Sequence, residues 1–145
     1  MLCPVCLGEV TAGSGVVDPH YDSLGKTWCP MSGREPFVWD EASTRVAVCS
    51  RSGGYCELGC GARASNMHHR RNRSQGGGWS PTNVAHLCGS GTTGCHGWVT
   101  HNPVEAHDLG LTLWTGEEPA DVPILTALGP VWLTDDICPP RPGWL

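Results

Sequence analysis

The sequence predicts a small zinc-stabilised protein of the α+β class, and three observations lead to this prediction. A chain of 145 residues buries too little apolar surface to be stable on a hydrophobic core alone if it divides into small modules. Nine cysteines and seven histidines supply an inventory of metal ligands. Twenty glycines and twelve prolines indicate many turns between short helices and strands. We therefore expect bound metal to replace part of the missing core.

The cysteines are expected to be reduced and to bind zinc. The first residues lack the charged and then apolar pattern of a secretory signal, so we expect a cytoplasmic protein in a reducing compartment. Cysteine pairs interleaved with histidines then indicate zinc ligands and not disulfides. The odd number of cysteines leaves at least one thiol unassigned. No apolar run approaches the roughly 18 to 20 residues that cross a bilayer, so we expect no membrane partner.

Residues 1–35 are predicted to form a zinc-ribbon-like module of two or three short strands. The segment begins with a CxxC pair and ends with a third cysteine beside proline and glycine, which favour tight turns. A histidine between them completes a tetrahedral ligand set, although it could instead be a lone surface histidine. The expected structural zinc ligands here are Cys3, Cys6, His20 and Cys29.

Residues 36–50 are predicted to be a linker followed by a short helix or strand. Val46, Val48 and Cys49 are apolar enough to be buried. Cys49 is therefore interpreted as a small core residue and not as a metal ligand.

Residues 51–107 carry two further cysteine pairs, which are expected to bind a second structural zinc. Cys56 and Cys60 lie before a histidine pair, and Cys88 and Cys95 lie after it. Both spacings are looser than the usual CxxC, and buried free thiols are the alternative. A zinc bound by four thiolates would contribute folding energy directly to this glycine-rich stretch.

Residues 108–145 are predicted to be a β-rich segment with a proline-rich tail. Apolar groups at 109–114, 122–125 and 131–133 are separated by glycine and proline, which indicates two or three strands joined by hairpin turns. Cys138 has no obvious mate and is either a free thiol or a contact across a dimer.

The net charge of −5 conceals a basic segment between two acidic ones. Residues 58–104 carry four arginines and no acid, whereas residues 1–57 and 105–145 carry net charges of −3 and −6. Such a segment suits local contact with phosphates. An ordinary solvated arginine face is the alternative.

The order of these motifs resembles the HNH endonucleases, which have a ββα-metal fold. The resemblance covers about a third of the chain and rests on Cys56-x3-Cys60, His68-His69, a Gly-Gly loop, Pro81-x-Asn83, Leu87-Cys88 and Cys95-His96. The run Cys88 to Trp98 and the N-terminal cysteine motifs look like those of small HNH proteins of actinobacterial phages and prophages. The resemblance implies a metal-dependent DNA endonuclease of low sequence specificity that nicks DNA or cleaves both strands, with terminase and portal proteins as expected partners.

The resemblance also implies roles for individual residues. His69 would be the general base, because an imidazole deprotonates water near neutral pH. His68 and His96 would hold one catalytic divalent ion, with His101 as a secondary candidate. Asn83 would orient His69 or the loop by a hydrogen bond. His68 stands where the family often has aspartate, so Mn²⁺, Ni²⁺, Co²⁺ or Zn²⁺ becomes more plausible relative to Mg²⁺.

Four arginines are expected to contact DNA phosphates around the scissile bond: Arg63, Arg70, Arg71 and Arg73. Trp79 and Trp98 could wedge against DNA, but Trp98 is expected in the core. The alternative function is a non-catalytic zinc module that binds DNA or a packaging protein. A zinc-ribbon transcriptional regulator is a third hypothesis, and it leaves the histidine pair unexplained.

Overall fold

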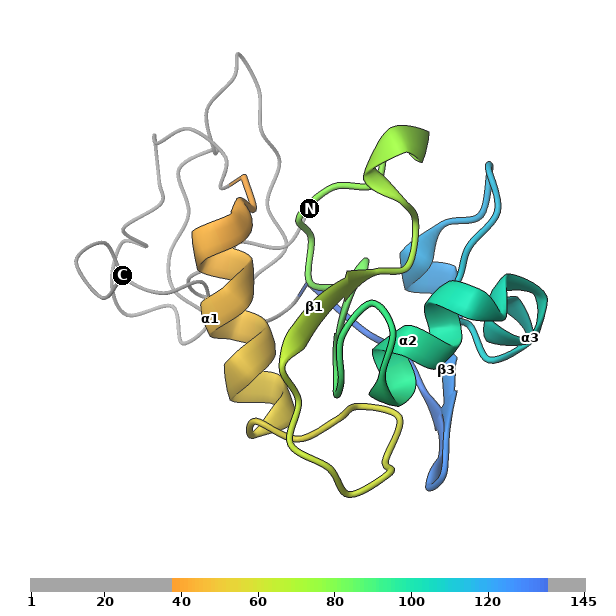
Figure 1. Ribbon diagram of the computed structural model, residues 1–145. Helices are drawn as coiled ribbons and strands as arrows, with labels where there is room; N and C mark the ends of the chain where they lie inside the picture. The colour runs from red at the N-terminus through yellow and green to blue at the C-terminus, as the bar shows by residue number, and fades with distance from the viewer. Residues whose placement is uncertain (1–37, 136–145) are drawn as a thin grey trace, which may run out of the picture.

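The computed structural model describes residues 38–135, which form a mixed α/β arrangement of short elements (Figure 1). The predicted ligands Cys3, Cys6, His20 and Cys29, and also Cys138, lie outside the described residues. The helices are α1 (Glu41–Ser52), α2 (Gly94–His101) and α3 (Pro103–Asp108). The strands are β1 (Asn66–His69), β2 (Val84–Leu87), β3 (Ile124–Thr126) and β4 (Gly129–Val131). Single 3-10 turns lie at Arg73–Gln75 and Pro119–Asp121.

Helix α1 resolves the choice between helix and strand for residues 36–50. Asp40 caps its first turn, because its carboxylate accepts from the Ser43 amide while the Ser43 hydroxyl accepts from the Asp40 amide. Gly53 ends the helix in the left-handed region at φ 62°. Val48 is buried as predicted, but Val46 and Cys49 are exposed. They lie on the solvent side of a helix whose buried face holds residues 43, 44, 47 and 48.

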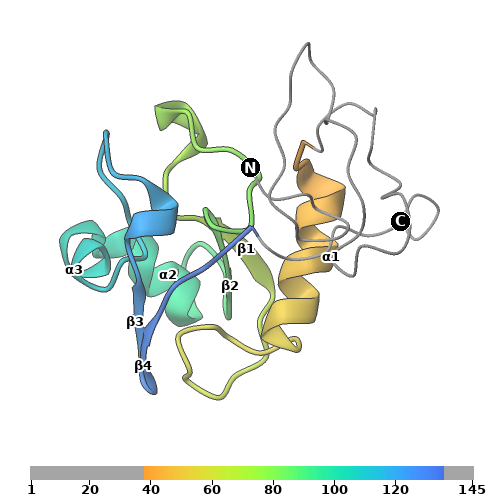
Figure 2. The same cartoon turned by 180° about the vertical axis from the view of Figure 1, so that it is seen from behind.

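Strands β1 and β2 form an antiparallel pair with His68 opposite Ala85 and His69 opposite Val84. All four residues of β2 are buried, because helices cover the pair from two directions. α1 lies on one side and α2 with α3 on the other, as Figures 1 and 2 show from opposite views. The chain order from β1 to β2 to α2 places the histidine pair and His96 within one ββα unit.

The C-terminal segment completes the core of this unit. Leu111, Ile124 and Leu133 are buried in one cluster with residues of β2 and α2. Of the two or three strands that the sequence predicted here, two are present, as the β3–β4 hairpin. The apolar group at 109–114 does not form a third strand. Gly110, at φ 73°, turns the chain, and the Leu111 amide donates to the Ala106 carbonyl at 2.8 Å, so the leucines are buried from a turn.

Within residues 38–135, no helix is both long and apolar enough to cross a membrane. Trp98 was expected in the core, but its side chain is 40% exposed. The buried residues of α2 are Gly97 and Val99, which turn toward β2 and leave Trp98 facing out.

Candidate functional site

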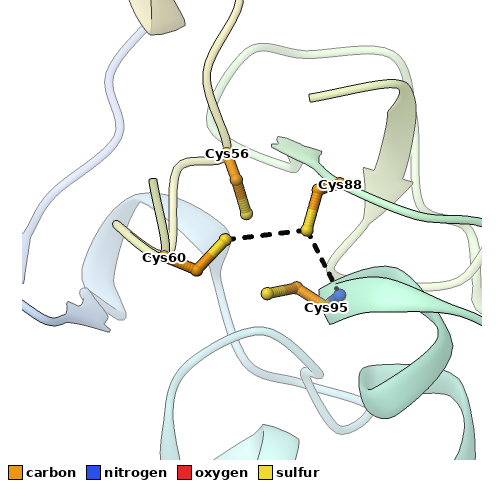
Figure 3. Close-up of side chains that lie close together, drawn as sticks. All are labelled: Cys56, Cys60, Cys88 and Cys95. Atoms are coloured by element: carbon orange, nitrogen blue, oxygen red, sulfur yellow. Dashed lines mark hydrogen bonds between the residues drawn. The ribbon is translucent and has the colours of Figure 1, made fainter. Parts of the chain in front are cut away.

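Four cysteines from three separate segments converge at one point of the fold. Cys56 and Cys60 lie in the turn after α1, Cys88 follows β2, and Cys95 lies in the first turn of α2. Their four sulfur atoms all lie within 4.8 Å of one another, and Figure 3 shows them pointing toward a common centre. The predicted convergence of these four cysteines is confirmed.

The spacing of the sulfurs fits a tetrahedral metal ion. Zinc–sulfur bonds of about 2.3 Å place thiolates roughly 3.8 Å apart, and Cys60 Sγ and Cys88 Sγ are 3.6 Å apart. A disulfide would require about 2.05 Å. The Cys95 amide also points at Cys88 Sγ, at 3.4 Å, as backbone amides do in a zinc knuckle. The cluster could therefore hold a metal ion such as zinc.

The protonation of the thiols supports the same conclusion. Burial raises the pKa of the Cys56 thiol, and burial together with the hydrogen bond to Cys88 raises the pKa of Cys95. A backbone amide at Ala62 lowers the pKa of the exposed Cys60 to about 7. Four thiolates this close repel one another, and a divalent cation is the partner that stabilises all of them in the charged form.

Three histidines border a second feature, a cleft of about 350 Å³. His68 and His69 come from β1 and His96 comes from α2. The rings of His68 and His96 meet edge to face, with centroids 5.5 Å apart. Arg73, after β1, also lines this cleft. The cleft therefore combines three imidazoles with one guanidinium.

His68 is held as a neutral imidazole. Its Nε2 lies 2.6 Å from the carbonyl oxygen of Leu111, and because a carbonyl only accepts, this nitrogen must carry the hydrogen. Burial lowers the pKa of His68 to about 4, so the ring is uncharged near neutral pH. The lone pair is therefore on Nδ1, which is the form that binds a metal ion.

His69 and His96 each leave a buried ring nitrogen without a partner. Nε2 of His69 and Nδ1 of His96 are fully enclosed, yet neither has a hydrogen-bond partner. The ring of His69 packs edge to face on Trp79 with centroids 4.5 Å apart. Burial, and then the charge of Arg73, lowers the pKa of His69. Because unpaired buried nitrogens are costly, these two atoms indicate positions where a ligand or a water binds.

His101, the secondary candidate for a metal ligand, and His86 both have structural partners outside the cleft. His101 Nδ1 bonds the Gly97 carbonyl of its own helix at 2.8 Å, and His101 does not line the cleft. Buried His86 bonds the Ser52 hydroxyl at 2.7 Å. Among residues 38–135 the four cysteines are the one group of three or more histidine, cysteine or acidic side chains with metal-binding spacing. A metal in the cleft would thus have two imidazole ligands and not three.

Asn83 holds the loop and not the imidazole of His69. Its side chain is buried and pairs with both backbone groups of Arg71, accepting from the amide at 2.8 Å and donating to the carbonyl at 3.1 Å. It donates also to the Gly78 carbonyl at 3.1 Å. Of the two roles predicted for Asn83, the structure shows the loop-orienting one.

Arg70 does not contact solvent, and the prediction that it binds DNA was wrong. Its side chain is 1% exposed and donates to the carbonyls of Gly110 at 2.7 Å, Thr82 at 2.9 Å and Pro119 at 2.9 Å, and to that of Val122. Burial lowers its pKa to about 10, so it remains charged at neutral pH. Arg70 is a structural residue that fastens β1 to the C-terminal segment.

The other predicted arginines differ in how free their guanidinium groups are. Arg71 is half-buried and donates through one guanidinium nitrogen to the Glu117 carbonyl, while its buried Nε has no partner. Arg63 is exposed and lies over the ring of Tyr55, at 5.1 Å from its centroid. Arg73 is exposed beside the histidines. Fewer arginines are therefore available to contact phosphates than the sequence predicted.

One charged residue near His69 was missed by the sequence analysis. Arg45 of α1 lies over the ring of Trp79, at 5.8 Å from the centroid, and its charge acts on the pKa of His69. The capping pattern Asp40-x-x-Ser43 would have identified the helix, but no local signal connects residue 45 with residue 79.

A scan against protein-family models and searches of curated proteins and of solved structures find no match. The cleft and the cysteine cluster are therefore the features of the described residues that bear on function.

Proposed function

We propose that the protein is a metal-dependent endonuclease that hydrolyses DNA phosphodiester bonds, with the histidine cleft as its active site. The observation that carries this proposal is the pair of enclosed, unpartnered nitrogens of His69 and His96 beside the neutral ring of His68. A fold that needed these imidazoles only for packing would satisfy or expose the nitrogens. Their retention without partners supports a site that binds a ligand.

His68 and His96 are the residues that would hold a divalent ion, through Nδ1 of each ring. Both atoms are available, because His68 Nε2 is bonded to Leu111 and His96 Nδ1 has no partner. When bound, such an ion would stabilise negative charge on the phosphate and on the departing 3′ oxygen. Two imidazole ligands favour Mn²⁺, Ni²⁺, Co²⁺ or Zn²⁺ over Mg²⁺.

His69 would act as the general base that deprotonates the attacking water. Its Nε2 is the unpartnered nitrogen, and Trp79 packs against the ring edge to face and limits its rotation. The lowered pKa keeps the ring in the neutral form that accepts a proton. Arg73 lines the same cleft and would contact a phosphate oxygen.

The cysteine cluster has a structural role in this proposal. Cys95 is the residue before His96, and the His96 amide donates to the Cys88 carbonyl at 3.0 Å. Zinc bound at the cluster would therefore fix the start of α2 and, with it, the position of His96.

Plasmid cleavage tests the proposal. The zinc-loaded protein is incubated with supercoiled plasmid and Mg²⁺, Mn²⁺, Co²⁺, Ni²⁺ or Zn²⁺ in turn, beside His69→Ala with the same measured zinc content. We expect metal-dependent nicking or linearisation by the wild type and a loss of at least about 100-fold in His69→Ala, the usual contribution of a general base. Absence of cleavage with every metal, despite full zinc loading and DNA binding, would instead support a non-catalytic zinc-bound DNA-binding module.

A further inference from the structure

The side chain of Trp79 packs against both Arg45 and His69. The ring of Trp79 lies 4.5 Å from the His69 ring and 5.8 Å from the Arg45 guanidinium, measured from its centroid. A cation within about 6 Å of an indole ring is attracted by it. Trp79 therefore lies between the Arg45 guanidinium of α1 and the ring of the proposed base, although α1 lies outside the segment that carries the histidines.

Arg45 is also free to change partners. Its present partner is Glu41, one helical turn earlier, at 2.8 Å, and both side chains are about half exposed, at 52% and 54%. Exposed ion pairs at this spacing are weak, whereas an arginine and a phosphate form strong, often bidentate, charge-assisted bonds. A phosphate at this place would thus displace the carboxylate at little cost.

Arg73 supplies a second free guanidinium at the same site. It is exposed, and it lines the cleft with His69. The other arginines near the histidines have their guanidinium groups bonded within the fold. Arg51 forms an ion pair with Glu57 at 2.6 Å, and Arg70 and Arg71 donate to carbonyls.

We propose that Arg45 and Arg73 together form a phosphate clamp beside His69, in which the backbone of duplex DNA replaces Glu41 as the partner of Arg45. This inference rests on the proposed nuclease function and deepens it, because it assigns the DNA-positioning charges to α1 and the turn after β1. Of the four arginines that the sequence predicted to contact DNA, Arg70 and Arg71 are bonded to backbone carbonyls instead.

The salt dependence of DNA binding tests the clamp without requiring cleavage. A short fluorescent duplex is titrated with the zinc-loaded full chain, with no further divalent ion added, over a series of salt concentrations. The logarithm of the association constant falls with the logarithm of salt by about 0.9 for each phosphate contact. We expect Arg45→Ala and Arg73→Ala each to reduce this slope by about 1 and to weaken binding roughly eightfold at about 0.1 M salt.

Three further variants separate a clamp from a general charge effect. Arg45→Lys keeps the cation and should retain most of the slope. Glu41→Gln frees Arg45 and should strengthen binding. Asp108→Asn changes the net charge by the same amount at the end of α3, on the opposite side of the molecule from α1 (Figures 1 and 2), and should leave binding near the wild-type value because salt screens distant charges.

The outcomes distinguish the clamp from the nuclease proposal. Salt-dependent binding by the wild type with an unchanged slope in either arginine variant overturns the clamp and leaves the nuclease proposal intact. Equal strengthening by Glu41→Gln and Asp108→Asn also overturns the clamp. No salt-dependent binding by the wild type at all contradicts DNA as the substrate, and with it the proposed function.

Discussion

Replacing Arg70 by alanine separates the structural role of this residue from the DNA-binding role that its sequence context suggests. The guanidinium is buried and donates to four backbone carbonyls, those of Thr82, Gly110, Pro119 and Val122. Three of these carbonyls belong to the segment after α3. Alanine would leave all four acceptors unpaired inside the protein and would open a cavity where the side chain lay.

The expected loss of stability follows from these bonds. A hydrogen bond to a charged group contributes about 1.5 to 3 kcal/mol, but the four bonds do not add fully, because water enters the cavity and the cost of burying the charge is removed. We therefore expect a loss of about 4 kcal/mol in the free energy of unfolding, a large fraction of the 5 to 15 kcal/mol typical of a domain. For a chain of this size that corresponds to a fall in Tm of roughly 10 °C or more.

Thermal unfolding of the zinc-loaded variant, followed by circular dichroism, measures this loss. Arg73→Ala is the matched control, because it removes an exposed guanidinium three residues away and should leave Tm within about 2 °C of the wild type. Arg70→Lys should also be destabilised, since one ammonium cannot reproduce the planar fork of donors. An Arg70→Ala protein with wild-type Tm and weakened DNA binding would refute the structural assignment.

Two further predictions concern the cysteine cluster and the loop. Cys88→Ser should lose the bound zinc and most of the folded structure, whereas Cys49→Ser, on the exposed face of α1, should keep both. Zinc content is measured by atomic emission and folding by circular dichroism. A folded, zinc-free Cys88→Ser protein would contradict the structural role. Asn83→Asp retains the acceptor for the Arg71 amide but loses the two donated bonds, so we expect a loss of about 2 kcal/mol and a lower kcat with little change in zinc content; unchanged unfolding in denaturant would show that the loop does not depend on these bonds.

The cysteine cluster was predictable because its signal lies in the spacing of the residues themselves. Cys56 with Cys60 and Cys88 with Cys95 form two close pairs, and a small glycine-rich chain has few other ways to gain stability. The apolar groups at 122–125 and 131–133, separated by glycine and proline, likewise predicted the β3–β4 hairpin. For residues 38–135, the sequence therefore predicted which four cysteines converge into a group that could hold a metal ion.

The role of Arg70 could not be predicted, because its acceptors lie far along the chain. The carbonyls of Gly110 and Val122 are 40 and 52 residues away. Because every residue has a backbone carbonyl, the sequence does not show which of them accept a hydrogen bond. Arg70, Arg71 and Arg73 look alike in the sequence, yet the tertiary packing buries the first, half-buries the second and exposes the third. The contact of Arg45 with Trp79 could not be predicted for the same reason, because the two residues lie far apart in the sequence.

The absence of a third strand, at 109–114, has a different physical cause. Leu109, Leu111 and Leu113 alternate as in a strand, and two of them are fully buried. Yet the backbone at Gly110 takes a positive φ, which strands rarely accommodate, and the following amides bond back to α3. Alternating apolar residues indicate that every second side chain is buried. A turn can bury side chains at the same spacing as a strand.

The bonds of Arg70 and His68 have a consequence for the order in which the chain completes its fold during synthesis. The ribosome releases β1 well before the residues that carry the carbonyls of Leu111 and Val122, and until then the Arg70 guanidinium and the His68 ring stay hydrated. The cysteine pairs can meet earlier, because Cys95 precedes those residues. A nascent chain that stops near residue 107 would therefore carry both cysteine pairs and the histidines, but not the backbone carbonyls that hold His68 and Arg70.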